Sequence, residues 1–533
     1  MKTPQCHRLP RGLTAALVAA SFTTPTPSVF AEEPPVASAN ATASLLDLSL
    51  EQLMNISVTS VSKKEQKLND VAAAISVISN EDLRRSGSTT IMDALRLVSG
   101  VNVGSLNSSQ WAISARGFNN LYANKLLVMV DGRAVYNPAF SGVFWDLQQT
   151  PLEDVDRIEV IRGPGATIWG ANAVNGVINV VTKSARETQG TMLYGGGGDV
   201  HQALGGGRYG GKVGENTYYR VFGGYFRNDD YPLANGRPAG DSWQGGQGGY
   251  RIDHYPDADT HLTWQADATV SDLDDHTADA HNLNTIGRWT RKLTEHSSLE
   301  AQAYYDRTHR NEPSRARATF DTLDLTAQYT FGLGERNDVI WGFGYRFVSS
   351  KFGQTTPLVK IRNDVSEQSL FSAFVQDEFT LVPGKLSLTT GIKVEHNDFT
   401  GMELQPSVRG VFKPTKSQTL WAAVSRAVRT PNQLEGRDVS AITLGAPFLG
   451  PGGALFAPTG VGNTSIESEN LIAYELGYRN QLTPKLSLDL AGFYNEYRNL
   501  ITFGPVNAFV PGAPFGQAEA PFGNLLSGET YGT

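Results

Sequence analysis

The sequence predicts an antiparallel β-barrel that spans a membrane, preceded by a compact α+β domain. After Arg186, apolar and polar residues alternate in stretches of about ten, separated by glycine- or aspartate-rich turns. No segment has the roughly 20 uninterrupted apolar residues of a transmembrane helix. A chain that crosses lipid without such helices needs a closed barrel, because lipid offers no partners to free backbone groups. Composition alone fits a soluble all-β secreted protein equally well.

The first 31 residues have the pattern of a secretory signal. A basic start is followed by a short apolar stretch, Leu13 to Phe22, and Val29-Phe30-Ala31 offers small residues for cleavage after Ala31. The single cysteine, Cys6, lies inside this segment. We therefore expect a mature chain without disulfides or zinc–thiolate sites.

The small domain is expected to contain two short helices and several strands. Asn80 is the expected N-cap of a helix through Arg85, and Ser88 or Thr89 that of a second helix ending before Gly100. The strands are expected in three places: residues 126–138, as two strands joined by an Asp-Gly turn, residues 156–161, and residues 177–181.

A glycine-rich stretch lies at residues 162–183, RGPGATIWGANAVNGVINVVTK. The most obvious interpretation of so many glycines is a phosphate-binding loop, and the sequence argues against it. No Gly-Lys-Ser/Thr follows, and GxGxxG spacing is absent from this stretch, so a phosphate-binding loop is disfavoured. That spacing does occur at Gly205, Gly207 and Gly210, but no helical pattern follows it.

Several separated motifs occur in the order found in one family. They are WAISARGFN at 111–119, LLVMVDGRAVYNP at 126–138, the stretch at 162–183, SRAVRTP at 425–431 and ENLIAYELGYR at 469–479. Together they resemble the TonB-dependent outer-membrane receptors. The resemblance implies an N-terminal periplasmic segment at 32–64, an α+β plug domain at 65–186 inside the lumen, and a barrel at 187–533.

The expected barrel is shorter than the resemblance implies. Members of the family have about 22 strands, and residues 187–533 accommodate roughly 15 or 16. The last residues, Gly532-Thr533, also differ from the C-terminal aromatic usual in the family. We therefore expect a C-terminally truncated sequence. The turns near residues 382–385 and 482–485 are expected on the periplasmic side, and the long link from Arg429 to Asn470 on the extracellular side.

One short segment resembles a TonB box, the extended stretch near the mature N-terminus of these receptors. A strand rich in β-branched residues can offer a free edge to a partner's sheet. The alternative is an ordinary first strand of the plug. The expected TonB contacts are Ile56, Ser57, Val58, Thr59, Ser60 and Val61.

The resemblance also implies an ionic latch between plug and barrel. Arg116 and Arg162 match two plug arginines that lie against acidic wall residues in the family, and Glu475 matches the Glu of its Tyr-Glu-x-Gly motif. Strand alternation places Leu476 and Tyr478 toward lipid and hence Glu475 toward the lumen. No second acidic partner is evident, and the alternative is that both arginines satisfy turn carbonyls.

Ligand contacts are expected at the two plug apices, residues 105–111 and 136–145. Aromatic residues there suit flat or catecholate-like ligands. Plug–barrel packing is the alternative, particularly for Phe144 and Trp145. The expected contact residues are Ser108, Gln110, Trp111, Tyr136, Phe140 and Trp145. A loop from Asp272 to His281 has transition-metal ligand types, but a solvated loop is favoured.

An enzyme is not expected, since no GxSxG, HExxH or EF-hand pattern appears. The formal net charge of −8 argues against a nucleic-acid surface. We expect a monomer in the outer membrane that needs no cofactor and works with a TonB-like periplasmic protein. It would import a scarce ligand, most commonly a ferric siderophore. Alternatives are cobalamin, another metal chelate or a carbohydrate, or a passive porin or adhesin.

Overall fold

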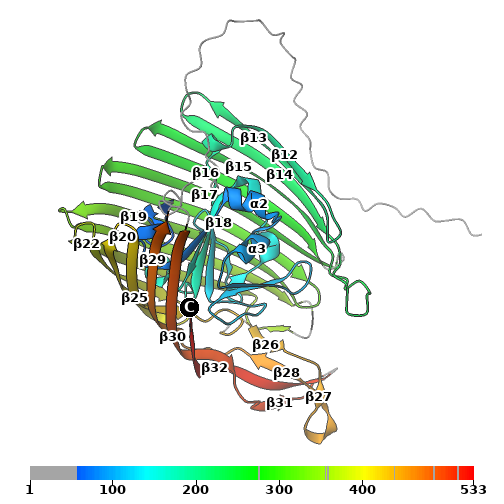
Figure 1. The fold of residues 1–533 in the computed structure, drawn as a ribbon. Helices are drawn as coiled ribbons and strands as arrows, with labels where there is room; N and C mark the ends of the chain where they lie inside the picture. The colour runs from blue at the N-terminus through cyan, green and yellow to red at the C-terminus, as the bar shows by residue number, and fades with distance from the viewer. Residues whose placement is uncertain are drawn as a thin grey trace, which may run out of the picture. The chain divides into compact units, whose positions relative to one another are not determined.

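The computed structural model describes residues 57–273, 277–354, 356, 359–436, 439–483, 486–512 and 515–533. The expected signal peptide, the segment to residue 55, Ile56 and residues 274–276 of the acidic loop lie outside the described residues. The plug elements lie within the concavity of one large curved sheet (Figure 1).

The N-terminal part of the described chain is an α+β domain, as expected. Its main sheet has the strand order β3-β10-β11-β6-β7, in which β10 is antiparallel to β3 and β11, and β11 is parallel to β6. The elements are β1 (Ser57–Val58), β2 (Gln66–Lys67), η1 (Leu68–Asp70), β3 (Ala74–Ser79), α2 (Asn80–Ser86), α3 (Ile91–Ala94), η2 (Leu95–Leu97), β4 (Val101–Ser105), β5 (Trp111–Ala115), β6 (Leu126–Val130), β7 (Arg133–Ala134), β8 (Tyr136–Asn137), β9 (Gly142–Val143), η3 (Trp145–Leu147), η4 (Leu152–Asp154), β10 (Val155–Arg162), α4 (Ala166–Trp169), β11 (Gly176–Thr182) and η5 (Ala185–Glu187).

Both helix starts were predicted at the wrong residue. Ser79, not Asn80, caps α2 in a reciprocal capping box with Asp82. Asn80 instead donates its side-chain amide to the Val155 carbonyl at 2.6 Å. Thr90, rather than Ser88 or Thr89, caps α3 by accepting from a backbone N–H. The errors arise because several consecutive residues have side chains able to cap, and tertiary contacts decide which one does.

The predicted hairpin at the Asp-Gly turn is confirmed. Asp131 and Gly132 have φ values of 49° and 80°, the pair of positive values that a type I′ turn requires. The Asp131 carboxylate accepts from the backbone N–H of Thr182 at 2.8 Å and from its hydroxyl at 2.7 Å. The turn is therefore tied to the end of β11, which holds the hairpin in the plug sheet.

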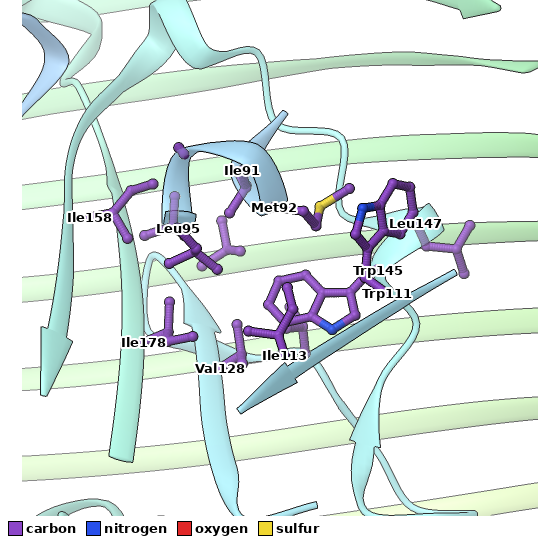
Figure 2. Packing of buried hydrophobic residues seen from close by; sticks show 14 of the residues in the cluster. Ile91, Met92, Leu95, Trp111, Ile113, Val128, Trp145, Leu147, Ile158 and Ile178 are labelled. Atoms are coloured by element: carbon purple, nitrogen blue, oxygen red, sulfur yellow. The ribbon is translucent and has the colours of Figure 1, made fainter. Parts of the chain in front are cut away.

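The plug core lies between this sheet and the short helices. Figure 2 shows Ile91, Met92 and Leu95 packed near strand residues such as Val128 and Ile178. These side chains are almost completely buried, with exposed fractions of at most 2 %. Full burial of each large apolar side chain contributes roughly 1.5–3 kcal/mol. The same cluster continues into the barrel wall, where it includes Trp243 and Leu273.

The long strands after η5 form an antiparallel ladder, as predicted. They are β12 (Gly190–Gly196), β13 (His201–Val213), β14 (Thr217–Asn228), β15 (Trp243–Asp257), β16 (Thr260–Leu273), β17 (Ala278–Thr294), β18 (Ser297–Glu312), β19 (Ala316–Leu333), β20 (Asn337–Gln354), β22 (Val365–Val382), β23 (Leu386–Asn397), β24 (Gly401–Thr415), β25 (Gln418–Arg429), β29 (Glu469–Thr483), β30 (Leu486–Phe503) and β32 (Gly516–Gly532).

The expected alternation of lipid-facing and lumen-facing residues is confirmed. In β29, Glu475 is 7 % exposed and the next residue, Leu476, is 63 % exposed. In β23, Ile392 faces outward while Lys393 and Glu395 are buried on the plug side. The wall therefore presents apolar side chains outward and polar ones inward. Among the described residues, no helix is long and apolar enough to cross a membrane.

The long link after Arg429 is folded. Its strands join the same hydrogen-bonded sheet as the barrel, and β28 runs parallel to the first half of β32. Figure 1 shows this group at the foot of the view, in orange and red. The short elements of this link are β26 (Val439–Thr443), β27 (Phe448–Leu449), η6 (Pro451–Gly453) and β28 (Leu455–Val461). Two further short strands of the same sheet lie outside the link, β21 (Val359–Ile361) and β31 (Ala508–Val510).

Candidate functional site

A buried ion pair joins the plug to the barrel wall at Arg116. Its Nη2 donates to Glu475 Oε1 at 2.6 Å, and the two side chains are 5 % and 4 % exposed. The guanidinium also lies over the Phe493 ring, 4.3 Å from its centre. Alternation along β29 turns Glu475 inward, and the structure brings it together with Arg116.

Arg162 does not take part in that pair. Its guanidinium donates to the Ser99 carbonyl at 2.7 Å and to the Ser76 hydroxyl at 3.2 Å. The carboxylate of Glu475 instead approaches the next residue, Gly163, where a Cβ atom would lie 2.4 Å from Oε1. Arg162 therefore follows the alternative expected for both arginines, since it binds a backbone carbonyl and a hydroxyl rather than a wall carboxylate.

A second charge cluster, which sequence reasoning missed, joins the plug to the same strand. Lys125 of the plug pairs with Glu469, which also accepts from Arg429 at 2.8 Å. Arg429 in turn binds Glu435 at 2.9 Å. Burial lowers the pKa of Lys125 to about 8. Glu469 precedes Glu475 by six residues, an even spacing that places both on one strand face, and this signal was available in the sequence.

The second cluster also holds a loop over the plug apex. Beyond Arg429, the backbone N–H groups of Gln433 and Leu434 donate to the carbonyls of Pro138 and Ala139. The loop from residue 430 to 436 is therefore hydrogen-bonded directly to the plug. A displacement of either part would have to break these bonds.

The expected TonB-contact segment packs against the plug sheet. The backbone N–H groups of Thr59 and Ser60 donate to the Glu159 carboxylate at 3.0 and 2.8 Å. Trp169 donates its indole N–H to the Ser60 carbonyl at 2.6 Å, and Val58 is 1 % exposed. Glu159 lies on β10, the strand between β3 and β11 in the plug sheet.

Two lysines follow this segment. Lys63 lies between two rings, 4.9 Å from the centre of Trp169 on the plug and 5.0 Å from that of Phe374 on β22. Lys64 binds Asp338 and Glu378 on the wall. The segment is thus bound to the plug on one side and to the barrel on the other.

The residues expected to contact ligand are largely buried. Trp111 and Trp145 lie in the plug core (Figure 2), and Trp111 also packs edge-on against Trp243 of the wall. Phe140 packs against Phe320 of the wall. Packing, the alternative we considered, therefore accounts for these three aromatics in this conformation, because each is buried in a cluster that includes residues of the barrel wall.

The three polar residues expected to contact ligand differ in their exposure and in their partners. Ser108 is 2 % exposed and its backbone N–H donates to Asp241 at 2.9 Å. Gln110 is partly exposed. Tyr136 donates its hydroxyl to Ser141 at 2.6 Å, accepts from Asn172 at 3.0 Å, and lines an interior cavity. Of the six expected contact residues, Tyr136 is the one that lines this cavity, together with Phe144 of the same apex.

The cavity has a volume of about 660 Å³ and lies between the plug and the inner face of the wall from β17 to β23. Thr59, Lys63, Tyr136 and Pro431 are among the residues that line it. Among the described residues, no group of three or more His, Cys, Asp or Glu side chains is placed to hold a metal ion.

The parts of the chain match two family models. Residues 67–177 match the TonB-dependent receptor plug domain, and residues 195–532 match the TonB dependent receptor-like β-barrel. The chain belongs to the TonB-dependent receptor family, the outer-membrane receptors in which a plug domain fills a β-barrel.

The relatives of this chain include a receptor named for a ferric chelate. The ferric enterobactin receptor of Pseudomonas aeruginosa is 26 % identical over 547 residues, covering 86 % of this chain and 71 % of its own. The iron-regulated outer membrane virulence protein of Vibrio cholerae is 24 % identical over 495 residues, covering 88 % and 72 %. The vitamin B12 transporter BtuB of Vibrio vulnificus is 33 % identical over 147 residues, covering 27 % and 23 %.

Solved structures share the fold. The siderophore receptor PirA of Acinetobacter baumannii superposes with a TM-score of 0.70 at 18 % identity, covering 87 % of this chain and 77 % of its own. A mutant ferric enterobactin receptor (PfeA) of P. aeruginosa in complex with enterobactin gives a TM-score of 0.71 at 20 % identity, covering 87 % and 78 %.

Proposed function

We propose that this protein imports a ferric siderophore across the outer membrane, using energy transmitted by a TonB-like periplasmic protein. Two relatives that this chain covers to a similar extent are named for ferric enterobactin and for iron regulation. The protein would work as a monomer surrounded by outer-membrane lipid, which fits its apolar outward face, with its N-terminal segment in the periplasm. The import itself requires no covalent chemistry and no cofactor.

The observation that carries this proposal is the attachment of the N-terminal segment to the plug. Glu159 binds two backbone N–H groups of residues 59 and 60, and Glu159 belongs to an inner strand of the plug sheet. A partner that pairs with residues 56–61 by strand addition and pulls would therefore transmit force into the plug. Arg116–Glu475 would resist this force until the plug moves.

The direct test replaces Val58 by proline. Proline removes a backbone N–H and cannot join a strand ladder at that position. We expect Val58→Pro to abolish energy-dependent uptake of ferric siderophore in cells while surface binding persists. Val58→Ala, which keeps the N–H, is the matched control and should retain uptake.

A passive porin or an adhesin predicts a different result. Uptake that persists in the proline variant, or that survives collapse of the inner-membrane potential, would contradict energy coupling. Binding of the chelate without any uptake, in the wild type as well as the variants, would favour an adhesin. The cobalamin alternative is tested in the same cells with labelled cobalamin in place of the ferric chelate.

A further inference from the structure

A groove crosses the outward face of the barrel wall. It has a volume of about 550 Å³ and is lined by residues of the strands from β15 to β20. Small residues on three adjacent strands form its floor, Gly287 on β17, Ala301 and Ala303 on β18, and Ala327 on β19. A Cβ atom added at Gly287 would meet no atom within 4 Å, so the floor is open at that point.

Large apolar side chains border this groove on both sides. Trp264 and Leu325 border it in one cross-strand row, and Trp289 and Phe343 border it in the next row. In each row the two borders are three strands apart, about 14 Å at the usual strand spacing. The indole N–H of Trp264 donates to the Thr285 hydroxyl at 3.0 Å. The polar edge of this ring is therefore satisfied without water.

Polar side chains on the same strands leave the groove apolar. Arg288 and Gln302 turn toward the plug, where they donate to the carbonyls of Asp131 and Gly132 at 2.6 and 3.2 Å. His254 lies at the margin, and its Nδ1 is hydrogen-bonded to a threonine hydroxyl at 2.8 Å. The groove is thus a recess within the apolar, lipid-facing surface of the wall.

The groove lies near the end of the barrel that is expected to face the periplasm. The turn between β19 and β20 is at this end, because Asn337 pairs with Phe379 beside the turn at residues 382–385. Arg291 is exposed and follows Trp289 on the same outward face, one row nearer this end. A basic side chain at the boundary of the apolar surface attracts the phosphate of a lipid headgroup.

We infer that this groove binds one phospholipid, with an acyl chain over Gly287 and Ala303 and the phosphate at Arg291. A helix of a protein partner is about 10–12 Å wide with its side chains. The bordering tryptophan, leucine and phenylalanine side chains leave less than that between them, whereas a single extended chain fits. The volume lies within the range of ligand pockets. The inference goes beyond the proposed import, and it requires the outer-membrane location but no particular cargo.

The experiment is native mass spectrometry of the whole receptor, extracted in a mild detergent and titrated with phosphatidylethanolamine. We expect one phospholipid to bind. Gly287→Leu fills the floor and should weaken binding about tenfold or more, since several CH₂ groups lose their apolar contacts. Leucine suits a strand better than glycine does, so the variant should fold. Arg291→Gln should weaken binding roughly fivefold, because one basic group near the headgroups is lost.

Gly410→Leu is the matched control. Gly410 lies on the outward face of β24 and does not line the groove. A Cβ atom there would make only an ordinary contact, 3.8 Å from the Ser387 carbonyl oxygen. This variant should bind the phospholipid as the wild type does.

Different results would overturn different parts of the inference. Wild-type affinity in both Gly287→Leu and the second groove-filling variant, Ala303→Phe, would place the phospholipid elsewhere. A receptor dimer that Gly287→Leu dissociates, with no phospholipid bound, would assign the groove to a second copy of this chain. Unchanged binding in Arg291→Gln would refute the position of the phosphate.

Uptake of ferric siderophore, measured in cells, separates this inference from the proposed function. A receptor that binds phospholipid in the groove but imports no ferric siderophore would refute the proposed cargo and support the lipid site. A receptor that imports the siderophore but binds no phospholipid would refute the lipid site alone.

Discussion

The buried ion pair between Arg116 and Glu475 gives a prediction about the stability of the plug. Removing one partner of such a pair leaves the other charged and desolvated, which typically costs about 3–5 kcal/mol. We expect Arg116→Met to destabilise the plug by that amount. Urea unfolding of the purified receptor, followed by tryptophan fluorescence, measures the change.

Arg162→Met is the control, because Arg162 binds a carbonyl and a hydroxyl rather than a carboxylate. We expect a smaller loss, about 1–2 kcal/mol for lost neutral-acceptor hydrogen bonds. Equal losses in the two variants would contradict the assignment of the ion pair to Arg116 alone.

Lys63 gives a pH-dependent prediction. Burial lowers its pKa to about 8, whereas a lysine in the unfolded chain has a pKa of about 10.4. The unfolded state therefore binds more protons between these two values, and the destabilising effect of Lys63 fades as pH rises through that window. We expect Lys63→Met to raise the thermal unfolding midpoint at pH 7 and to lose most of that gain at pH 10.

The control for this measurement is Lys67→Met, since Lys67 is exposed on β2. Its effect on the unfolding midpoint should be small and similar at both pH values. A gain in Lys63→Met that is the same at pH 7 and pH 10 would show that the lysine is not titrating between them.

At the scale of elements, Glu159 links the N-terminal segment to β10. Hydrogen bonds to a charged acceptor contribute roughly 1.5–3 kcal/mol. We expect Glu159→Gln to accelerate hydrogen exchange at the amides of Thr59 and Ser60 by about tenfold or more. Asp156→Asn is the control, because Asp156 is 40 % exposed and its carboxylate binds the Arg157 side chain rather than the N-terminal segment. Unchanged exchange in Glu159→Gln would mean that other contacts hold the segment.

The strand predictions were correct where apolar and polar residues alternate regularly along the sequence. The alternation in β23 and β29 is set by the two-residue period of a strand, and burial follows it. The Asp131-Gly132 hairpin follows from backbone conformations that glycine and aspartate tolerate. Helix caps were misplaced by one or two residues, because neighbouring side chains compete for the same backbone groups.

At the scale of the whole molecule, charge pairs anchor the plug to many strands of the wall. Asp154 pairs with Arg208 on β13 and Asp146 with Arg310 on β18, while Arg116 and Lys125 bind β29. Arg429 joins the second anchor to the loop that is hydrogen-bonded over the plug apex. We expect Arg429→Met to destabilise the receptor by about 3–5 kcal/mol, since two buried carboxylates lose a partner.

Arg426→Met is the matched control on the same strand, because Arg426 is partly exposed, lies 3.6 Å from Glu403, and otherwise donates to neutral acceptors, the Leu404 carbonyl and the Asn470 side chain. Urea unfolding compares the two variants, and hydrogen exchange should increase across residues 430–436 only in Arg429→Met. An unchanged loop in that variant would mean that its hydrogen bonds to Pro138 and Ala139 suffice to hold it.

The sequence by itself determined the class of protein, the order of plug and barrel, and the inward orientation of Glu475. Each of these follows from a short-range pattern or a motif that is read within a few residues. Only the tertiary structure decided that Arg116 rather than Arg162 pairs with Glu475, and that Lys125 pairs with Glu469, 344 residues away. It also decided that Trp111 and Trp145 are covered. Such contacts depend on which wall strand faces which side of the plug, and this is set by the register and curvature of the whole sheet.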